Sequence, residues 1–425
     1  MLYLSSVVAL GFSASVEDVS VTVHPERAAS IDVVKATAGV TWTAAPHPRF
    51  SAEAPGASKS LLGVIGNWTD MIEQALARGD MQALLHDENV EIPESFDSAT
   101  QWPHCAKTIN DIRDQSNCGC CWAFAGAEAG SDRMCIATNG KLNVPLSAQD
   151  VCFNSNTNGC NGGMIDTPWT FFQHHGAVSG GQYKGSGPFG SGFCADFSLP
   201  HCHHHGPQGD DPYPAEGKKG CPSEKSPKGP TKCGSTARGA HTTYASDKYS
   251  FVGSTATARG EKAIQQMIMA GGPVETAFSV YDDFEDYAGG IYHHVTGKLG
   301  GGHAVKFVGW GVEDGTKYWK VANSWNPYWG ESGYFRIKRG NNECGIEAGV
   351  TGSSADAKWS KGADPHPDNK DCLDVKAQTE CLSPDEFNCM WCDFGSGVGM
   401  CDDKGDKVPG AKCKGPTGDE GVVVF

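Results

Sequence analysis

A cysteine at the start of an alanine-rich run and a histidine far downstream have the residue types of a thiol acyl-transfer site. Cys121 lies directly before Trp122, and the residues that follow, as far as Ala137, predict a buried helix that begins at Cys121. A helix N-terminus and a nearby imidazolium both stabilise a thiolate and lower the thiol pKa from its usual value of about 8.5. His303 is the candidate imidazole. The predicted chemistry is attack by the Cys121 thiolate on an acyl group.

Two further groups would complete such a site. Asn323 can hydrogen-bond to the second ring nitrogen of His303 and hold the ring in position, and Trp325 can shield that bond from water. The side-chain amide of Gln115 can form an oxyanion hole together with the backbone N–H of Cys121. Taken singly, each residue could equally be a buried cysteine, a core histidine or a turn asparagine, but their joint presence favours a catalytic site.

The motifs that contain these groups resemble the papain family of cysteine proteases and, within it, cathepsin B. The resemblance covers residues 92–352 and implies an α+β, papain-like fold of two lobes. A helical left lobe and a β-barrel-like right lobe would enclose the cleft between them. The residues after His303 themselves predict three strands with glycine-rich turns between them, at residues 304–310, 317–322 and 333–338. The matching motifs, in chain order, are Gln115, Cys118, Cys121-Trp122, Cys160-Asn161-Gly162-Gly163, Gly302-His303-Ala304 and Asn323-Ser324-Trp325.

The resemblance also decides between two adjacent cysteines. Neighbouring residues on a helix point about 100° apart, so only one of Cys120 and Cys121 can face a cleft. The family has its nucleophile directly before the tryptophan, which selects Cys121 and leaves Cys120 as a free thiol. Once Cys121 is set aside, an odd number of the 18 cysteines remains, so some thiol must stay unpaired, with Cys344 a second candidate. The resemblance implies the disulfides Cys105–Cys135, Cys118–Cys160 and Cys202–Cys221.

Several glycines would bind substrate if the resemblance holds. Gly162, Gly163 and Gly302 would line the cleft together with Trp325. Gly349 would form the floor of the S2 pocket, where cathepsin B-like enzymes often carry glutamate, although Glu347 lies nearby. A glycine there predicts a deep, uncharged pocket and a preference for bulky apolar residues at the P2 position of the substrate.

An insertion at residues 194–233 resembles the occluding loop of the cathepsin B group. His204 and His205 match its paired histidines, of which an imidazolium can bind a terminal carboxylate and allow removal of C-terminal dipeptides. Asp114 would hold His204, but Tyr328 stands where a second holding acid is expected, and the loop is long. A looser loop predicts mainly endopeptidase action. Metal binding by Cys202 and the histidines is an alternative, but the ligand spacing of a zinc motif is missing, and neither metal nor cofactor is predicted.

The rest of the chain predicts a secreted precursor. Residues 1–14 resemble a signal peptide, with a buried N-terminal strand as the alternative. Residues 15–91 would be a propeptide that runs through the cleft and leaves at low pH, as carboxylates that hold it become protonated. Asn67 begins its glycosylation sequon. Residues 353–425 carry six cysteines and predict a small disulfide-rich C-terminal module, with zinc binding through Cys389 and Cys392 as the alternative.

Composition limits the environment and the partners. The chain of 425 residues has a formal charge of −16, which argues against nucleic acid, and its 18 cysteines favour an oxidising compartment. No run reaches the ~18 apolar residues of a membrane span. We therefore expect a lysosomal, vacuolar or extracellular cysteine peptidase with peptide and protein substrates, its own propeptide as inhibitor, and cystatin-like inhibitors. The alternative is a catalytically silent binding or adhesion protein that acts through the C-terminal module.

Overall fold

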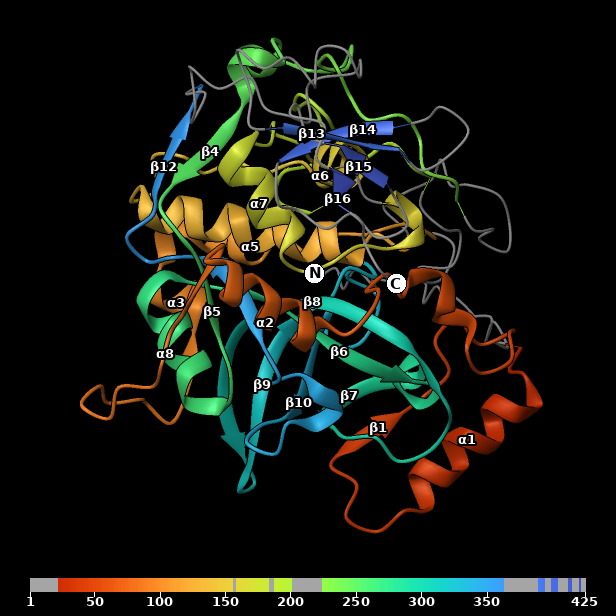
Figure 1. Cartoon of the computed structure of the whole chain (residues 1–425). Coiled ribbons are helices and arrows are strands. Elements are labelled where there is room, and N and C mark those ends of the chain that lie inside the picture. The colour runs from red at the N-terminus through yellow and green to blue at the C-terminus, as the bar shows by residue number, and fades with distance from the viewer. Residues whose placement is uncertain are drawn as a thin grey trace, which may run out of the picture.

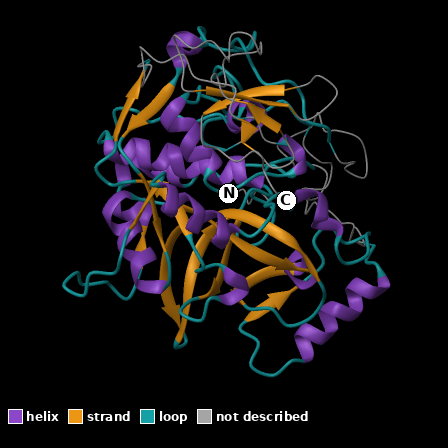
Figure 2. Cartoon of the chain, viewed as in Figure 1, coloured by secondary structure: helices purple, strands orange, loops and turns teal. Residues whose placement is uncertain are grey.

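The structure, a computed structural model, describes residues 22–155, 158–182, 187–200 and 224–362, together with four short strands between residues 389 and 421. The helices around α5 (Cys121–Ala137) lie on one side of a large sheet, helix α2 (Trp68–Arg78) runs between them, and α1 (Pro25–Ala36) lies on the sheet side (Figures 1 and 2). The predicted signal peptide, His204, His205 and the pair Cys202–Cys221 lie outside the described residues. No helix in the described ranges has the length and apolar content that a membrane span requires.

Helix α5 (Cys121–Ala137) forms the centre of the helical side. Every residue from Cys121 to Cys135 is buried, and these include the charged residues Glu128, Asp132 and Arg133 as well as apolar and small ones. Helices α6 (Ala148–Asn154) and α7 (Thr167–His174) pack against it. The predicted helix beginning at Cys121 is therefore confirmed.

The centre of the sheet side is built from four antiparallel strands. β6 (Val274–Tyr281), β8 (Leu299–Glu313), β9 (Thr316–Ala322) and β10 (Tyr334–Lys338) pair in the order β6-β8-β9-β10. The three strands predicted after His303 are thus confirmed, and α5 packs against β8 (Figure 1).

The strands of the predicted β-barrel-like lobe form an open mixed sheet and do not close into a barrel. Among the described strands the path runs β1-β7-β10-β9-β8-β6-β11-β5-β2 without closing. Its outermost strands, β1 (Trp42–Ala44) and β2 (Met81–Ala83), both come from the N-terminal segment, which we define as residues 22–91. Each end of the sheet therefore pairs with this segment instead of with the opposite end. The strands next to them are β7 (Tyr287–Tyr292), β5 (Thr255–Ala258) and β11 (Val350–Ser353).

Two helices of the N-terminal segment are bounded by local signals. α1 (Pro25–Ala36) has proline in its first turn, where no backbone N–H is needed. α2 starts after Asn67, whose side chain accepts a hydrogen bond from the N–H of Thr69, and ends at Gly79 with a φ of 86°.

Three disulfides occur within the described residues. They are Cys105–Cys135 and Cys118–Cys160, which the resemblance implied, and Cys194–Cys233, which closes the base of the insertion. The remaining short elements are β3 (Phe96–Asp97), α3 (Ser98–Gln101), α4 (Ala106–Ile109), β4 (Tyr249–Val252), α8 (Glu261–Gly271) and β12 (Lys358–Lys361).

The C-terminal region contributes a small sheet of four strands. Its strands are β13 (Cys389–Asp393), β14 (Gly399–Asp403), β15 (Lys412–Lys414) and β16 (Glu420–Gly421), in the order β14-β13-β15-β16. The disulfides and the zinc alternative considered for this region concern side chains outside the described part of the chain.

Candidate active site

Cys121 is the first residue of α5, and its sulfur lies beneath the N-terminal segment. The Sγ atom accepts hydrogen bonds from the backbone N–H of Gly63 at 3.2 Å and of Ala304 at 3.4 Å. Burial nevertheless outweighs these donors and raises the pKa of the Cys121 thiol to about 12. In this state of the protein the sulfur is therefore a protonated thiol.

His303 lies on β8 and is held by Asn323. Nε2 of the ring is 2.8 Å from Oδ1 of Asn323, and that oxygen also accepts from the backbone N–H of Ser324. The Trp325 ring lies 5.0 Å from the imidazole, centroid to centroid, and is completely buried. Nδ1 has no hydrogen-bond partner among the described residues. The bond to Asn323 uses Nε2, so Nδ1 is left to exchange a proton.

The imidazole is neutral in this arrangement. Burial lowers the pKa of His303 to about 4, although the bond to Asn323 acts in the opposite direction. Because the Cys121 thiol is protonated and the His303 imidazole is neutral, the two side chains do not form a thiolate–imidazolium ion pair in this state.

The side chain of Gln115 is held by three hydrogen bonds. Its Oε1 accepts from the hydroxyl of Ser324 at 2.7 Å, which directs the amide nitrogen toward two carbonyl oxygens. Nε2 donates to the carbonyl of Cys118 at 2.8 Å and to that of Leu61 at 2.9 Å. The donor predicted for an oxyanion hole thus already binds a carbonyl of the N-terminal segment. The role of Ser324 was missed, since only its place beside Asn323 could have indicated it.

The N-terminal segment pairs with both walls of the cleft as an extended chain. The N–H of Val64 donates to the carbonyl of Gly302, and the N–H of Ile65 donates to that of Gly163, each at 3.1 Å. Gly163 also donates to the carbonyl of Gly63 at 2.8 Å. A Cβ atom on Gly163 would overlap the ring of Trp122, so no other residue fits there. Gly162 likewise lies directly against the segment.

The predicted S2 floor is in contact with α2. A Cβ atom on Gly349 would overlap the Cδ1 methyl of Ile72, so this isoleucine occupies the space that a larger residue at position 349 would take. The carboxylate of Glu347 is engaged elsewhere, since it accepts from the indole N–H of Trp319 at 2.8 Å and from the N–H of Gly340 and of Asn342. Hydrogen bonds thus hold the Glu347 carboxylate against the neighbouring loop.

Asp114, the predicted partner of His204, faces an arginine of the N-terminal segment. One carboxylate oxygen accepts from the N–H of Ser116 at 2.7 Å and lies 3.9 Å from the guanidinium of Arg49. Arg49 also donates to the carbonyl of Ser116 at 2.8 Å. Next to it, the Phe50 ring packs edge-to-face on Trp325 at 5.5 Å. No motif in the sequence indicated the contact of Arg49 with Asp114.

A buried ion pair anchors α1 to the sheet side. Arg27 is completely buried and donates to Glu285 at 2.7 Å and to Asp286 at 2.9 Å. Burial raises the pKa of Asp286 to about 7 in spite of the arginine. No motif in the sequence indicated this pair.

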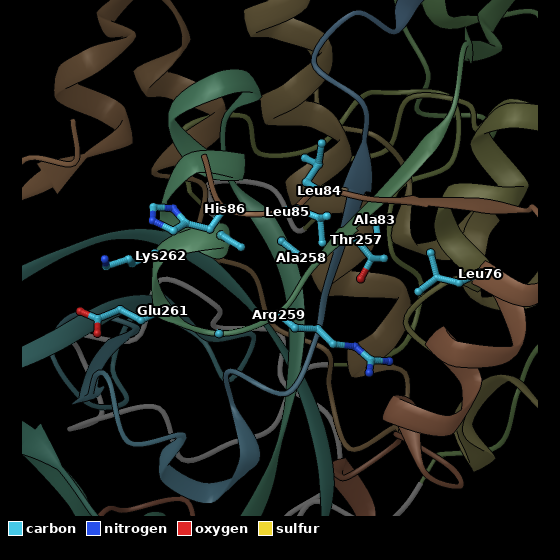
Figure 3. Close-up of a pocket in the computed structure, with 12 residues that line it drawn as sticks. Leu76, Ala83, Leu84, Leu85, His86, Thr257, Ala258, Arg259, Glu261 and Lys262 are labelled. Atoms are coloured by element: carbon cyan, nitrogen blue, oxygen red, sulfur yellow. The ribbon is translucent and has the colours of Figure 1, made fainter. Parts of the chain in front are cut away.

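Two pockets of the structure lie away from the catalytic groups. One, of about 370 Å³, is enclosed by Leu76 and residues 83–86 of the N-terminal segment on one side and by residues 257–263 on the other (Figure 3). A second, of about 870 Å³, is lined by Pro93, Trp310 and Arg336 among others. Neither contains Cys121 or His303, because the N-terminal segment fills the cleft beside them.

A buried thiol at a helix start, an imidazole held by an asparagine and an amide that binds a carbonyl together define a papain-like cysteine protease site. Residues 92–353 match the family described as papain family cysteine protease, and the chain belongs to this family.

The similar proteins are cathepsin B-like. The chain is 43% identical over 316 residues to cathepsin B-like cysteine proteinase 6 of Caenorhabditis elegans, which covers 73% of this chain and 79% of that protein. It is 48% identical over 280 residues to cathepsin B-like cysteine proteinase 4 of the same organism, with coverages of 64% and 78%. Among solved structures, proCathepsin B S9 from Trypanosoma congolense has a TM-score of 0.60 at 30% identity and covers 76% of this chain and 96% of that one.

Proposed function

We propose that this chain, once its N-terminal segment has been removed, hydrolyses peptide bonds with Cys121 as the nucleophile. Nδ1 of His303 takes the proton of the thiol, and the sulfur attacks the carbonyl carbon of the scissile bond. The Gln115 amide and the N–H of Cys121 stabilise the negative charge that develops on the carbonyl oxygen. The amine leaves with the proton from His303, and water then hydrolyses the thioester with His303 as base. Asn323 keeps the imidazole in place through both steps.

One observation carries this proposal. The Gln115 amide donates a 2.9 Å hydrogen bond to the carbonyl of Leu61, and Gly63, two residues further on, donates to the sulfur of Cys121. A peptide carbonyl therefore lies in the donor site beside the thiol, where a substrate carbonyl would have to lie.

We propose further that residues 15–91 act as a propeptide, after a signal peptide at residues 1–14, and that cleavage near Glu91-Ile92 releases activity. The support is threefold: the segment occupies the oxyanion donor, covers the sulfur and pairs with Gly163 and Gly302. Removing it would return water to the cleft. The thiol pKa would then fall and the imidazole pKa rise, which favours the charged pair that catalysis needs.

The proposed specificity follows from the S2 pocket. Gly349 adds no charge, and Glu347 is hydrogen-bonded to the adjoining loop, so a bulky apolar P2 side chain should be preferred. The isoleucine that lies on Gly349 in the precursor, Ile72, has this chemistry. Comparing peptides with Phe or Arg at P2 tests the proposal, and equal or faster cleavage of the Arg peptide would overturn it.

The insertion and the environment complete the proposal. We propose mainly endopeptidase action, with removal of C-terminal dipeptides where His204 and His205 can bind the terminal carboxylate. The proposed location is the lysosome, a vacuole or the extracellular space, where cystatin-like inhibitors could bind the open cleft, and Asn67 would be glycosylated in the precursor.

The central test is peptidase activity of the trimmed chain and of matched thiol variants. Cys121→Ala should abolish hydrolysis, whereas Cys344→Ala, which removes a thiol outside the cleft, should leave it unchanged. Loss of activity on His303→Ala would agree with this account. Hydrolysis that persists in Cys121→Ala would contradict it.

A further inference from the structure

Three cysteine sulfur atoms lie close together beside the start of α5, where the proposed nucleophile Cys121 is located. The Sγ atoms of Cys118, Cys120 and Cys152 all lie within 4.8 Å of one another, and all three residues are buried. Cys118 is bonded to Cys160, whereas Cys120 and Cys152 are thiols in the structure. Cys120 precedes Cys121 as the cap residue of α5, and Cys152 lies on α6.

The surroundings of Cys120 and Cys152 favour a disulfide over a metal site. Both residues belong to the apolar core of the helical side, and the nearest oxygen acceptor of Cys120 is the carbonyl of Gln115, at 4.0 Å. A zinc site would need four ligands, but Cys118 is already part of a disulfide. In an oxidising compartment, two buried thiols this close together favour disulfide formation.

We propose that Cys120 and Cys152 form a further disulfide, which joins the start of the catalytic helix α5 to α6 next to Cys121. Their sulfurs, which lie within 4.8 Å of each other in the structure, must approach to about 2.0 Å for this bond. The bond would tie down one end of the loop from Gln115 to Cys121, which carries the oxyanion donor, and would remove a competing thiol beside the nucleophile. This inference does not depend on the proposed peptidase activity.

The number of cysteines agrees with this pairing. If Cys121 is the nucleophile and Cys344 stays a thiol, an even number of the 18 cysteines remains. Six of these form the three disulfides within the described residues. Cys120 and Cys152 account for two more, and those outside the described side chains are again even in number. With the Cys120–Cys152 bond, Cys120 is no longer the free thiol that the sequence predicted, and Cys344 takes that place.

The bond forms by thiol–disulfide exchange with a small-molecule disulfide such as glutathione disulfide. The thiolate of one cysteine attacks a sulfur of the reagent and releases one thiol, and the second cysteine then attacks the mixed disulfide and releases the other. Two electrons pass from the protein pair to the reagent, and the two protons go to the released thiols. Burial raises the pKa of the Cys120 thiol, so the exchange should precede the packing of α5 on α6.

Site-resolved thiol labelling of the full-length chain tests the proposal. The chain carries Cys121→Ala to prevent self-cleavage and is folded with glutathione disulfide. Free thiols are alkylated with iodoacetamide in denaturant, disulfides are then reduced, and the new thiols are labelled with N-ethylmaleimide. Tandem mass spectrometry should find maleimide on Cys120 and Cys152, as on Cys105 and Cys135, and acetamide on Cys344. Acetamide on Cys120 and Cys152 in molecules whose Cys105 carries maleimide would overturn the proposal.

Two matched variants identify the partner. In Cys152→Ser, Cys120 should change from maleimide to acetamide in every molecule, while Cys105 and Cys135 keep maleimide and so report an intact fold. In Cys344→Ser, Cys120 should keep its maleimide. If Cys120 kept maleimide in Cys152→Ser, its partner would be another cysteine and the proposal would be wrong.

Discussion

The side-chain amide of Gln115 donates a 2.9 Å hydrogen bond to the backbone carbonyl of Leu61, 54 residues earlier in the chain. This contact connects the two parts of the protein, since Gln115 belongs to the cleft and Leu61 to the segment that fills it. The group proposed to stabilise the oxyanion is thus the group that holds the blocking segment. Inhibition and catalysis therefore share one donor.

Replacing Gln115 by alanine should reduce the turnover number of the trimmed enzyme with little change in KM. Loss of one oxyanion donor lowers kcat by about 10²–10³-fold in comparable sites, because the bond is strongest in the transition state. Steady-state kinetics on a peptide substrate measures this. A rise in KM at unchanged kcat would instead mean that Gln115 only binds the substrate ground state.

Gly63→Ala should weaken inhibition in the untrimmed chain. A Cβ atom on Gly63 would overlap the carbonyl oxygen of Gly119, so the segment would have to lift from the sulfur of Cys121. We expect the residual peptidase activity of the precursor to rise about tenfold or more, which corresponds to roughly 1.4 kcal/mol of lost binding. Glu88→Ala, at an exposed position of the same segment, is the control and should leave inhibition unchanged. Equal activities of the two precursors would contradict the proposed blocking contact.

Arg27→Ala should release activity faster at every pH, since it leaves Glu285 and Asp286 buried without their cation. Breaking a buried pair in this way costs about 3–5 kcal/mol. Lys35→Ala, on an exposed position of the same helix, is the control and should behave as wild type. The measurement is the rate at which peptidase activity appears in the purified precursor.

Asp286 should not be the group that triggers release in acid. Burial raises its pKa to about 7, so the docked state holds its proton more tightly than an exposed carboxyl would, and falling pH favours docking at this site. Asp286→Asn should therefore keep the acid acceleration of release. If Asp286→Asn lost the acid acceleration of release, protonation of Asp286 would favour release of the segment and not its docking, which would contradict this prediction.

Glu128 should make the protein less stable as the pH rises. Its carboxyl is buried beside Lys306 and Asp132, and burial raises its pKa from 4.5 to about 8. Between these values the folded state keeps a proton that the unfolded state has lost. The free energy of unfolding should therefore fall with pH by up to about 1.4 kcal/mol per unit and level off above pH 8.

Glu128→Gln should remove that contribution. Urea titrations of the Cys121→Ala chain between pH 5 and about 8 would compare the slopes, with Glu73→Gln on the exposed side of α2 as the control. An unchanged slope in Glu128→Gln would show that Glu128 is not the titrating group.

Local pattern was enough to predict the elements that carry the catalytic groups. The Ala-rich run after Cys121 became α5, and the strands after His303 became β8, β9 and β10. The structure also brings His303 to Asn323 and Trp325, as the ordered motifs led us to expect.

Contacts between residues far apart in the chain could not be predicted from local sequence patterns. Arg27 and Glu285 are 258 positions apart, and nothing near either residue marks it as half of a buried pair. The open edges of the sheet could not be predicted for the same reason, because β1 and β2 pair with strands far downstream. The approach of Cys152 to Cys120 was likewise visible only once α5 and α6 had been packed together.

The most direct test of the account is the rate and position of labelling by a thiol-reactive epoxide. The precursor and the trimmed chain are each incubated with the reagent, and the adduct is located by mass spectrometry. We predict labelling of Cys121 alone, fast in the trimmed chain and slow in the precursor, where the thiol has a pKa of about 12. An adduct on Cys120, or equal rates in the two forms, would contradict the account.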